Sequence, residues 1–293
     1  MRACFVLLLF AFAAVLLGIP APAQDVAATP APPQTVPEIQ SPDTGSAGAP
    51  AVPADPVGDA ARAVFEQYRQ TVVTLKIVVS VSFGGDESES ESEANATLIS
   101  PDGLAVLALS AIDPTPLLGA DLTADPDNPF SLRIVSLKMI LAGAEEREAE
   151  VVLRDKDLDV VFVRLREAPQ EPLPYADPAH AADSVRVLEP YVCIGQEEPV
   201  VQRAHTAFID RIEGVVSRPR TYYLVARSRT QQILCSPLFT LEGRLIGFGV
   251  ARHQRIEDVG NELPAVVVPA AQIGELMSQV QPRGEIPAEA PQS

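Results

Sequence analysis

The alternation of apolar and polar residues predicts a chain built mainly from β-strands. Strand-like patterns recur at residues 72–81, 132–141, 148–153, 184–188, 191–195, 206–216 and 221–226. Residues 231–250 predict a β-hairpin, because two apolar segments flank a tight turn at Glu242-Gly243. Helical spacing precedes the first strand, in residues 58–69, and returns in residues 270–280. We therefore expect an all-β domain with an N-terminal helix and a C-terminal helix.

The N-terminal residues predict export to the periplasm, the cell envelope or the extracellular space. Arg2, an apolar run over residues 5–19 and the tripeptide Ala-Pro-Ala ending at Ala23 follow each other as in a signal peptide cleaved after Ala23. The alternative is a retained N-terminal anchor, although the run is shorter than the roughly 20 residues that span a bilayer. After cleavage we expect no membrane span. Residues 24–57 are rich in Ala, Pro, Ser and Thr and predict a disordered linker.

The charge of the chain argues against two classes of partner. A formal net charge of −17 disfavours binding to nucleic acid phosphates or anionic lipid, which both require clusters of Lys and Arg. Residues 86–93 alternate acid and serine, and the repulsion between these acids predicts an extended, solvated loop. Weak cation binding or an electrostatic partner surface is the alternative there. The spacing of a calcium loop is missing, so we assign no metal and no cofactor.

The cysteines leave two possibilities open. Cys4 precedes the apolar run and is expected to leave with the signal peptide, so that Cys193 and Cys235 remain in an oxidising compartment. They form either a disulfide or, as we expect, two buried free thiols, because the sequence does not give the Cα separation that a disulfide requires.

Several motifs in order resemble one known family. Residues 95–113 contain a strand, a Ser-Pro-Asp-Gly turn and a second strand, and residues 154–165 contain Asp-Leu-Asp-Val-Val at a strand start. Val-Cys-Ile-Gly ends at Gly195, and the hairpin contains Pro-Leu and Ile-Gly. These segments resemble the protease domain of trypsin-like serine proteases, in particular the secreted bacterial HtrA-type group.

The resemblance implies a chymotrypsin-like pair of antiparallel, six-stranded β-barrels. The first barrel is expected at about residues 70–166 and the second at about residues 182–270, within a domain that covers residues 58–280. Residues 281–293 are expected to form a short disordered tail.

The same resemblance locates the catalytic positions and implies that two of them are replaced. Counting from the shared motifs places Ser110 at the position of the histidine base, Asp159 at the triad aspartate and Leu234 at the nucleophile. Cys235 and Ser236 stand where the family has two glycines. A serine hydroxyl is no base near neutral pH and leucine is no nucleophile, so we expect no catalytic residue. Asp159 is then a structural carboxylate bonded to backbone amides.

Three hypotheses for function follow. The first is an exported pseudoprotease that binds a protein or a peptide by strand addition, which requires no triad. The candidate strand contains Arg244, Leu245, Ile246, Gly247, Phe248, Gly249 and Val250. The second is an active peptidase with Cys235 as the nucleophile and His253 or His205 as its base. The third is a structural protein of the cell envelope. The sequence leaves the ligand and the oligomeric state open.

Overall fold

The computed structural model describes residues 54–83, 86–115, 130–252 and 265–283. Val57–Ser293 form one compact unit, to which the features below belong. The predicted signal peptide, most of the predicted linker, His253 and most of the predicted tail lie outside the described residues. The predicted domain boundaries and the predicted export therefore stay predictions.

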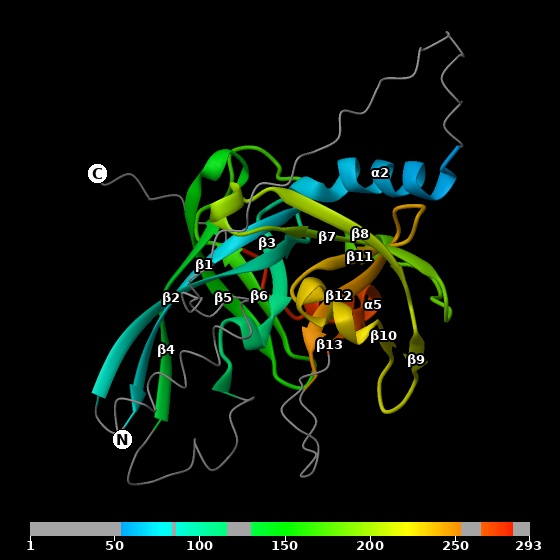
Figure 1. The fold of residues 1–293 in the computed structure, drawn as a ribbon. Coiled ribbons are helices and arrows are strands. Elements are labelled where there is room, and N and C mark those ends of the chain that lie inside the picture. The colour runs from blue at the N-terminus through cyan, green and yellow to red at the C-terminus, as the bar shows by residue number, and fades with distance from the viewer. Residues whose placement is uncertain (1–53, 84–85, 116–129, 253–264, 284–293) are drawn as a thin grey trace, which may run out of the picture. The chain divides into compact units, whose positions relative to one another are not determined.

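Six antiparallel strands close into a barrel, in the order β1-β2-β3-β6-β5-β4 (Figure 1). Their bounds are β1 (Val72–Phe83), β2 (Asp86–Leu98), β3 (Leu104–Ala108), β4 (Phe130–Ile140), β5 (Glu146–Asp155) and β6 (Val160–Leu165). The helix α2 (Pro56–Tyr68) precedes β1 and buries Ala61 and Val64. Leu75, Ile77 and Phe162 are fully buried in the core cluster, as the apolar alternation predicts.

The second half of the unit is a seven-stranded sheet in the order β8-β7-β11-β12-β13-β10-β9. Its strands are β7 (Pro190–Gln196), β8 (His205–Arg211), β9 (Gly214–Val216), β10 (Tyr222–Leu224), β11 (Pro237–Phe239), β12 (Leu245–Ala251) and β13 (Ala265–Pro269). A short helix α4 (Thr230–Ile233) precedes β11, and α5 (Ala270–Met277) follows β13. The predicted all-β class and both predicted terminal helices are confirmed. The second sheet differs from the expected six-stranded barrel, because it has seven strands and its outermost strands are β8 and β9.

Polar and aromatic contacts join the barrel to the second sheet. The Thr74 hydroxyl donates to Oε1 of Gln196 at 2.7 Å, and Nε2 of His205 lies 3.0 Å from the Val72 carbonyl oxygen. The ring of Tyr68, at the end of α2, stacks on Phe239 with 4.2 Å between centroids. These contacts lie at or just before the start of β1, so this end of the strand is one point of attachment between the barrel and the second sheet.

The acidic segment at residues 86–93 is part of a strand, and the prediction of a loop there is wrong. β2 pairs with β1 without interruption, from Val72 opposite Thr97 to Phe83 opposite Asp86. Because side chains alternate along a strand, the glutamates share one face of β2 and the serines share the other. Lys76 on β1 lies beside Glu91, Arg133 on β4 beside Glu87 and Arg203 beside Glu93, which is why the repulsion between the carboxylates does not prevent a strand.

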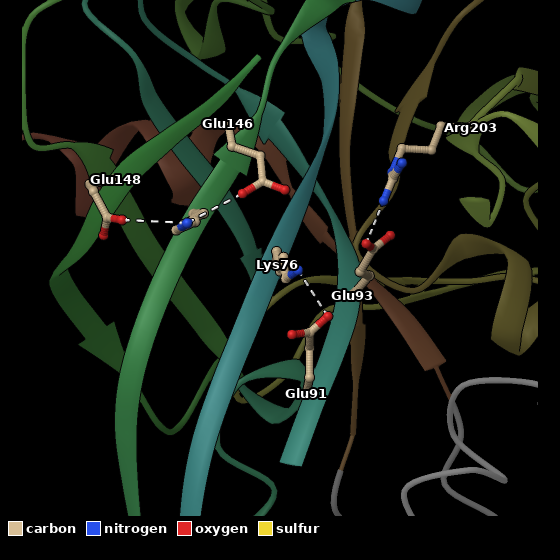
Figure 2. Close-up of polar contacts among 7 residues, drawn as sticks. Lys76, Glu91, Glu93, Glu146, Glu148 and Arg203 are labelled. Carbon is tan, nitrogen blue, oxygen red and sulfur yellow. Dashed lines mark hydrogen bonds and ion pairs between the residues drawn. The ribbon is translucent and has the colours of Figure 1, made fainter. Parts of the chain in front are cut away.

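Figure 2 shows how the charges on this face are balanced. Lys76 on β1 stands directly opposite Lys138 on β4, an arrangement of like charges that is unfavourable by itself. Nζ of Lys76 lies 2.9 Å from Glu91, while Nζ of Lys138 lies 3.3 Å from Glu146 and 3.9 Å from Glu148 on β5. Each lysine therefore has its own carboxylate partners on the neighbouring strand.

Two glycines are required by the backbone around the motifs that the sequence singled out. Gly103, in the Ser-Pro-Asp-Gly turn, has φ of +86°, the left-handed region that favours glycine. Gly249 on β12 lies against the segment that follows α4, and a Cβ on it would stand 1.9 Å from the Ile233 carbonyl oxygen. The close approach at Gly249 positions the segment that carries Leu234 and Cys235.

Replacing Gly249 by alanine should destabilise the fold. The added methyl group would have to displace main-chain atoms, so Gly249→Ala should lower the free energy of unfolding by at least about 2 kcal/mol in chemical denaturation. The matched control is Gly274→Ala in α5, where the nearest atom to a Cβ is a side-chain carbon of Pro178 at 3.6 Å. Alanine at that helical position should be neutral or stabilise by up to about 1 kcal/mol. Wild-type stability of Gly249→Ala would contradict the close approach.

Candidate functional site

The residues at the three predicted triad positions come from separate elements. Ser110 lies in the 3₁₀ turn η2 (Leu109–Ala111), which directly follows β3. Asp159 immediately precedes β6, and Leu234 directly follows α4. Ser110 is buried, and Asp159 and Leu234 are each partly buried. The structure brings Ser110 and Asp159 into direct contact.

The Asp159 carboxylate accepts hydrogen bonds from both halves of the unit. Its Oδ1 accepts from the Ser110 backbone N–H at 2.7 Å, and its Oδ2 accepts from the Ser110 hydroxyl at 2.8 Å. Oδ2 also accepts from the backbone N–H of Ala251, the last residue of β12, at 2.8 Å. The expectation of a carboxylate bonded to backbone amides agrees with these contacts. The carboxylate thus connects the end of β12 to η2.

The backbone of Asp159 takes part in the same arrangement. Its carbonyl oxygen accepts from the Leu109 N–H at 2.9 Å, and its φ is +56°, in the left-handed region. A non-glycine residue adopts this conformation only where surrounding contacts hold it, and such residues are uncommon. The side-chain and main-chain bonds to η2 supply such contacts.

Burial raises the pKa of Asp159 from its usual 3.8 to about 6, because the ionised carboxylate is removed from water. The hydrogen bonds from Ser110 and Ala251 act in the opposite direction and lower this pKa. Desolvation is the larger effect. Asp159 therefore carries its proton more readily in the folded chain than a free aspartate would.

Leu234 stands in a turn that is held against β12. The Cys235 N–H donates to the Gly249 carbonyl at 2.9 Å, and the Gly249 N–H donates to the Ser236 carbonyl at 3.0 Å. The Leu234 side chain packs against the core cluster. Cys235 has φ of +62°, so this turn contains a left-handed position that a cysteine occupies. An aliphatic side chain at this point offers no atom that can attack a carbonyl.

Both cysteines in the described residues are buried free thiols, as expected. The pKa of Cys235 is raised to about 12, chiefly by burial; a hydrogen bond with the Ala108 backbone lowers this pKa, and the Asp159 charge adds to the increase. Burial likewise raises the pKa of Cys193 to about 12. At neutral pH both groups are therefore thiols, whereas the thiolate is the reactive form. His205, one of the two candidate bases, points instead at the Val72 carbonyl oxygen.

The predicted peptide-binding strand is a central strand of its sheet. β12 pairs with β11 on one side, where Leu238 faces Gly247, and with β13 on the other, where Val267 faces Gly249. All residues of β12 are buried, and Arg244 donates to the Ala181 carbonyl and to Asp183. A peptide cannot pair with residues 244–250 without displacing one of these strands. The hairpin pattern predicts the pairing of β12 with β11, but it does not record that β13 pairs with the other side of β12.

The sequence analysis missed the contribution of the residues that end β12. Ala251 acts through its backbone N–H, which leaves no side-chain signal in the sequence. The Arg252 guanidinium donates to the Asp157 carbonyl and to the Tyr222 hydroxyl, both at 2.9 Å, and lies over the Tyr222 ring. These contacts hold the C-terminal end of β12 beside the turn that contains Asp159.

Two possible features are not found in the described part of the chain. Within it, no group of three or more His, Cys, Asp or Glu side chains could hold a metal ion. No helix among the described residues is both long and apolar enough to cross a membrane.

Comparison with known proteins gives matches among solved structures. No family model matches the chain, and no curated protein matches it. Two of the similar structures are of the HtrA-type protease AlgW, one with a tripeptide and one with a decapeptide, each 13% identical in sequence. The TM-scores are 0.48 and 0.49, and each match covers 75% of this chain. The chain spans 62% and 66% of these structures, which is less than two thirds of their length.

The pH dependence of stability tests the environment of Asp159. The folded chain holds this proton more tightly than the unfolded chain, since the pKa is about 6 when folded and 3.8 ordinarily. The group therefore contributes stability that is fully present below 3.8 and is lost as the pH rises through about 6. Relative to Asp159→Asn, which cannot titrate, the wild-type free energy of unfolding should fall by about 2 kcal/mol between about pH 4 and about pH 7.

The control for this measurement is Ser110→Ala, which keeps the carboxylate. It should retain the pH dependence with its midpoint moved upward, because the hydroxyl bond that lowers the Asp159 pKa is lost. Denaturant titrations of the three proteins at each pH give the comparison. A difference between wild type and Asp159→Asn that stays constant, or increases, with rising pH would show that the carboxylate is not desolvated.

Proposed function

We propose that the chain is an exported, catalytically inactive homologue of trypsin-like serine proteases that acts by binding a protein or a peptide. One observation carries the proposal. The carboxylate at the triad aspartate position accepts from the hydroxyl and N–H of Ser110 and from the N–H of Ala251. A triad aspartate orients a histidine, whereas Asp159 holds two backbone segments together.

The turn at Leu234 supports the same proposal. Acyl transfer requires a nucleophile beside a base, and it gains most from backbone amides aimed at the developing oxyanion. Here the N–H of Cys235 is already bonded to the Gly249 carbonyl, and the partly buried Leu234 side chain packs against the core. Neither group is available to a substrate carbonyl.

The alternative of a cysteine peptidase has less support. Cys235 is 3% exposed, and its thiol has a pKa of about 12. Activation of a thiol requires the opposite environment, with a cation or an imidazole that lowers the pKa.

The binding half of the proposal is constrained by sheet topology. Strand addition requires an unpaired main-chain edge, and among the described strands of the second sheet only the terminal strands β8 and β9 have one. β8 is the longer, with seven residues against three, and its Ile209 is 40% exposed. We therefore place peptide pairing on this sheet at β8.

Activity probes test the loss of chemistry. The purified protein should show neither labelling by a fluorophosphonate and a thiol alkylating probe under native conditions nor turnover of unfolded casein. Cys235→Ala should behave like the wild type in the same assay, with trypsin as the positive control. Casein turnover that Cys235→Ala abolishes would overturn the proposal in favour of the cysteine peptidase.

Binding is measured separately, by the fluorescence anisotropy of labelled, unfolded casein. The wild type should bind, and Ile209→Pro on β8 should weaken binding because proline removes a main-chain donor and distorts the edge. Val216→Pro, on the short free edge β9, is the matched control and should bind like the wild type. If casein does not bind, or binds equally to all three proteins, the β8 assignment is refuted while the activity result still stands.

A further inference from the structure

Three strands extend beyond the rest of the barrel and form what we call the arm. The arm contains residues 78–83 of β1, 86–91 of β2 and 130–134 of β4, which run side by side in Figure 1. β2 pairs with β3 only through Thr97 and Leu98, and β4 pairs with β5 only from Lys138 to Ile140. Within the described residues, the outer edges of β2 and β4 in the arm are therefore unpaired.

The two free edges differ in charge. On β2, Asp86 and every second residue from Glu87 to Glu93 are acidic. Charged side chains commonly protect the edge of a sheet against pairing with another strand. β4 contains no acid at all between Phe130 and Ile140, and Arg133 is its single charged residue within the arm. The β2 edge is protected and the β4 edge is not.

The free edge of β4 has an apolar face and a polar face. Phe130, Leu132 and Ile134 are half-buried, while Ser131 and Arg133 between them are exposed. Leu132 stands beside Val81 and Ile134 beside Val79, in the same rows of the arm. These rows continue the face that holds the fully buried Ile77. A strand that paired with this edge of β4 would extend the sheet and place its own side chains beside the apolar face.

We propose that this edge pairs with the same edge of a second copy of the chain, antiparallel and centred on Leu132. In that register Leu132 faces Leu132 of the second copy, Phe130 faces its Ile134, and Ser131 faces its Arg133. The segment is self-complementary, because every apolar residue meets an apolar residue and no arginine stands opposite an arginine. The contact is isologous and closes after two copies.

The geometry of the arm leaves room for such a dimer. β4 runs from the free arm toward its own barrel, so antiparallel pairing places the two barrels at opposite ends of the joined strands. Two chains that each carry a formal charge of −17 repel one another, and β4 is the free edge of the arm that carries no acid of its own, although Glu87 on β2 lies 3.6 Å from Arg133. Because salt screens this repulsion, dimerisation should strengthen as salt concentration rises.

Sedimentation equilibrium of the purified protein tests the contact. The wild type should show a monomer–dimer equilibrium at concentrations up to about 100 µM, and Leu132→Lys should raise the dimer Kd at least about tenfold by placing two cations opposite each other. The matched control is Ser88→Lys, which lies in the same row as Leu132 on the protected edge, across Val81. It should leave the dimer Kd within about twofold of the wild-type value.

A second variant tests the register and does not depend on a half-buried position. Ser131 is exposed, and Ser131→Glu places a carboxylate opposite Arg133 of the second copy twice per dimer. It should lower the dimer Kd by about threefold or more, although it makes both chains more negative. Repulsion between the two negatively charged chains alone predicts the opposite change, a higher dimer Kd. A monomeric wild type, a dimer insensitive to Leu132→Lys, or a weaker dimer in Ser131→Glu would each overturn the proposal.

Discussion

One partly buried carboxylate connects the barrel to the second sheet. Asp159 joins η2, which follows β3 of the barrel, to the last residue of β12 in the second sheet, through three hydrogen bonds of 2.7 to 2.8 Å. The bonds compensate only part of the cost of removing the charge from water, as its raised pKa indicates. The surrounding geometry, which includes the left-handed backbone of Asp159 itself, therefore holds the carboxylate where its ionised form is destabilised.

The second constraint is the close packing around β12. This strand pairs on both sides and is buried throughout its length, and Gly249 allows the Leu234 turn to lie directly on it. A turn held so closely is an effective support for a reactive side chain. In this chain the same support presents leucine and a buried thiol, so the scaffold and the chemistry that it could carry are separate properties.

The sequence predicted the features that depend on local patterns. The alternation of apolar residues predicts β1, β4 and β12, and the Ser-Pro-Asp-Gly turn has the positive φ expected at Gly103. The motif register also placed Ser110 and Asp159 at positions that prove to be in contact. These inferences succeed because each relies on residues that are close in the sequence or on a short motif.

The missed features depend on which strands pair and on where main-chain groups point, neither of which the pattern within one strand records. The acidic run is a strand because β1 supplies its partner residues and Lys76 supplies charge balance, neither of which is visible within the run. β12 is unavailable to a peptide because β13, the next strand along the chain, occupies its second edge. Ala251 contributes a main-chain donor, and no side-chain pattern records where an N–H points.

The central claim is that the Asp159 carboxylate holds η2 and the end of β12 together. Backbone amide chemical shifts measured by NMR as a function of pH test it directly, because an N–H that donates to a carboxylate responds when that carboxylate takes up a proton. The account predicts that the amides of Ser110 and Ala251 shift together with one midpoint near 6, and that Asp159→Asn abolishes both shifts. Amides that titrate with different midpoints, or an Ala251 amide that does not respond while Ser110 does, would contradict it.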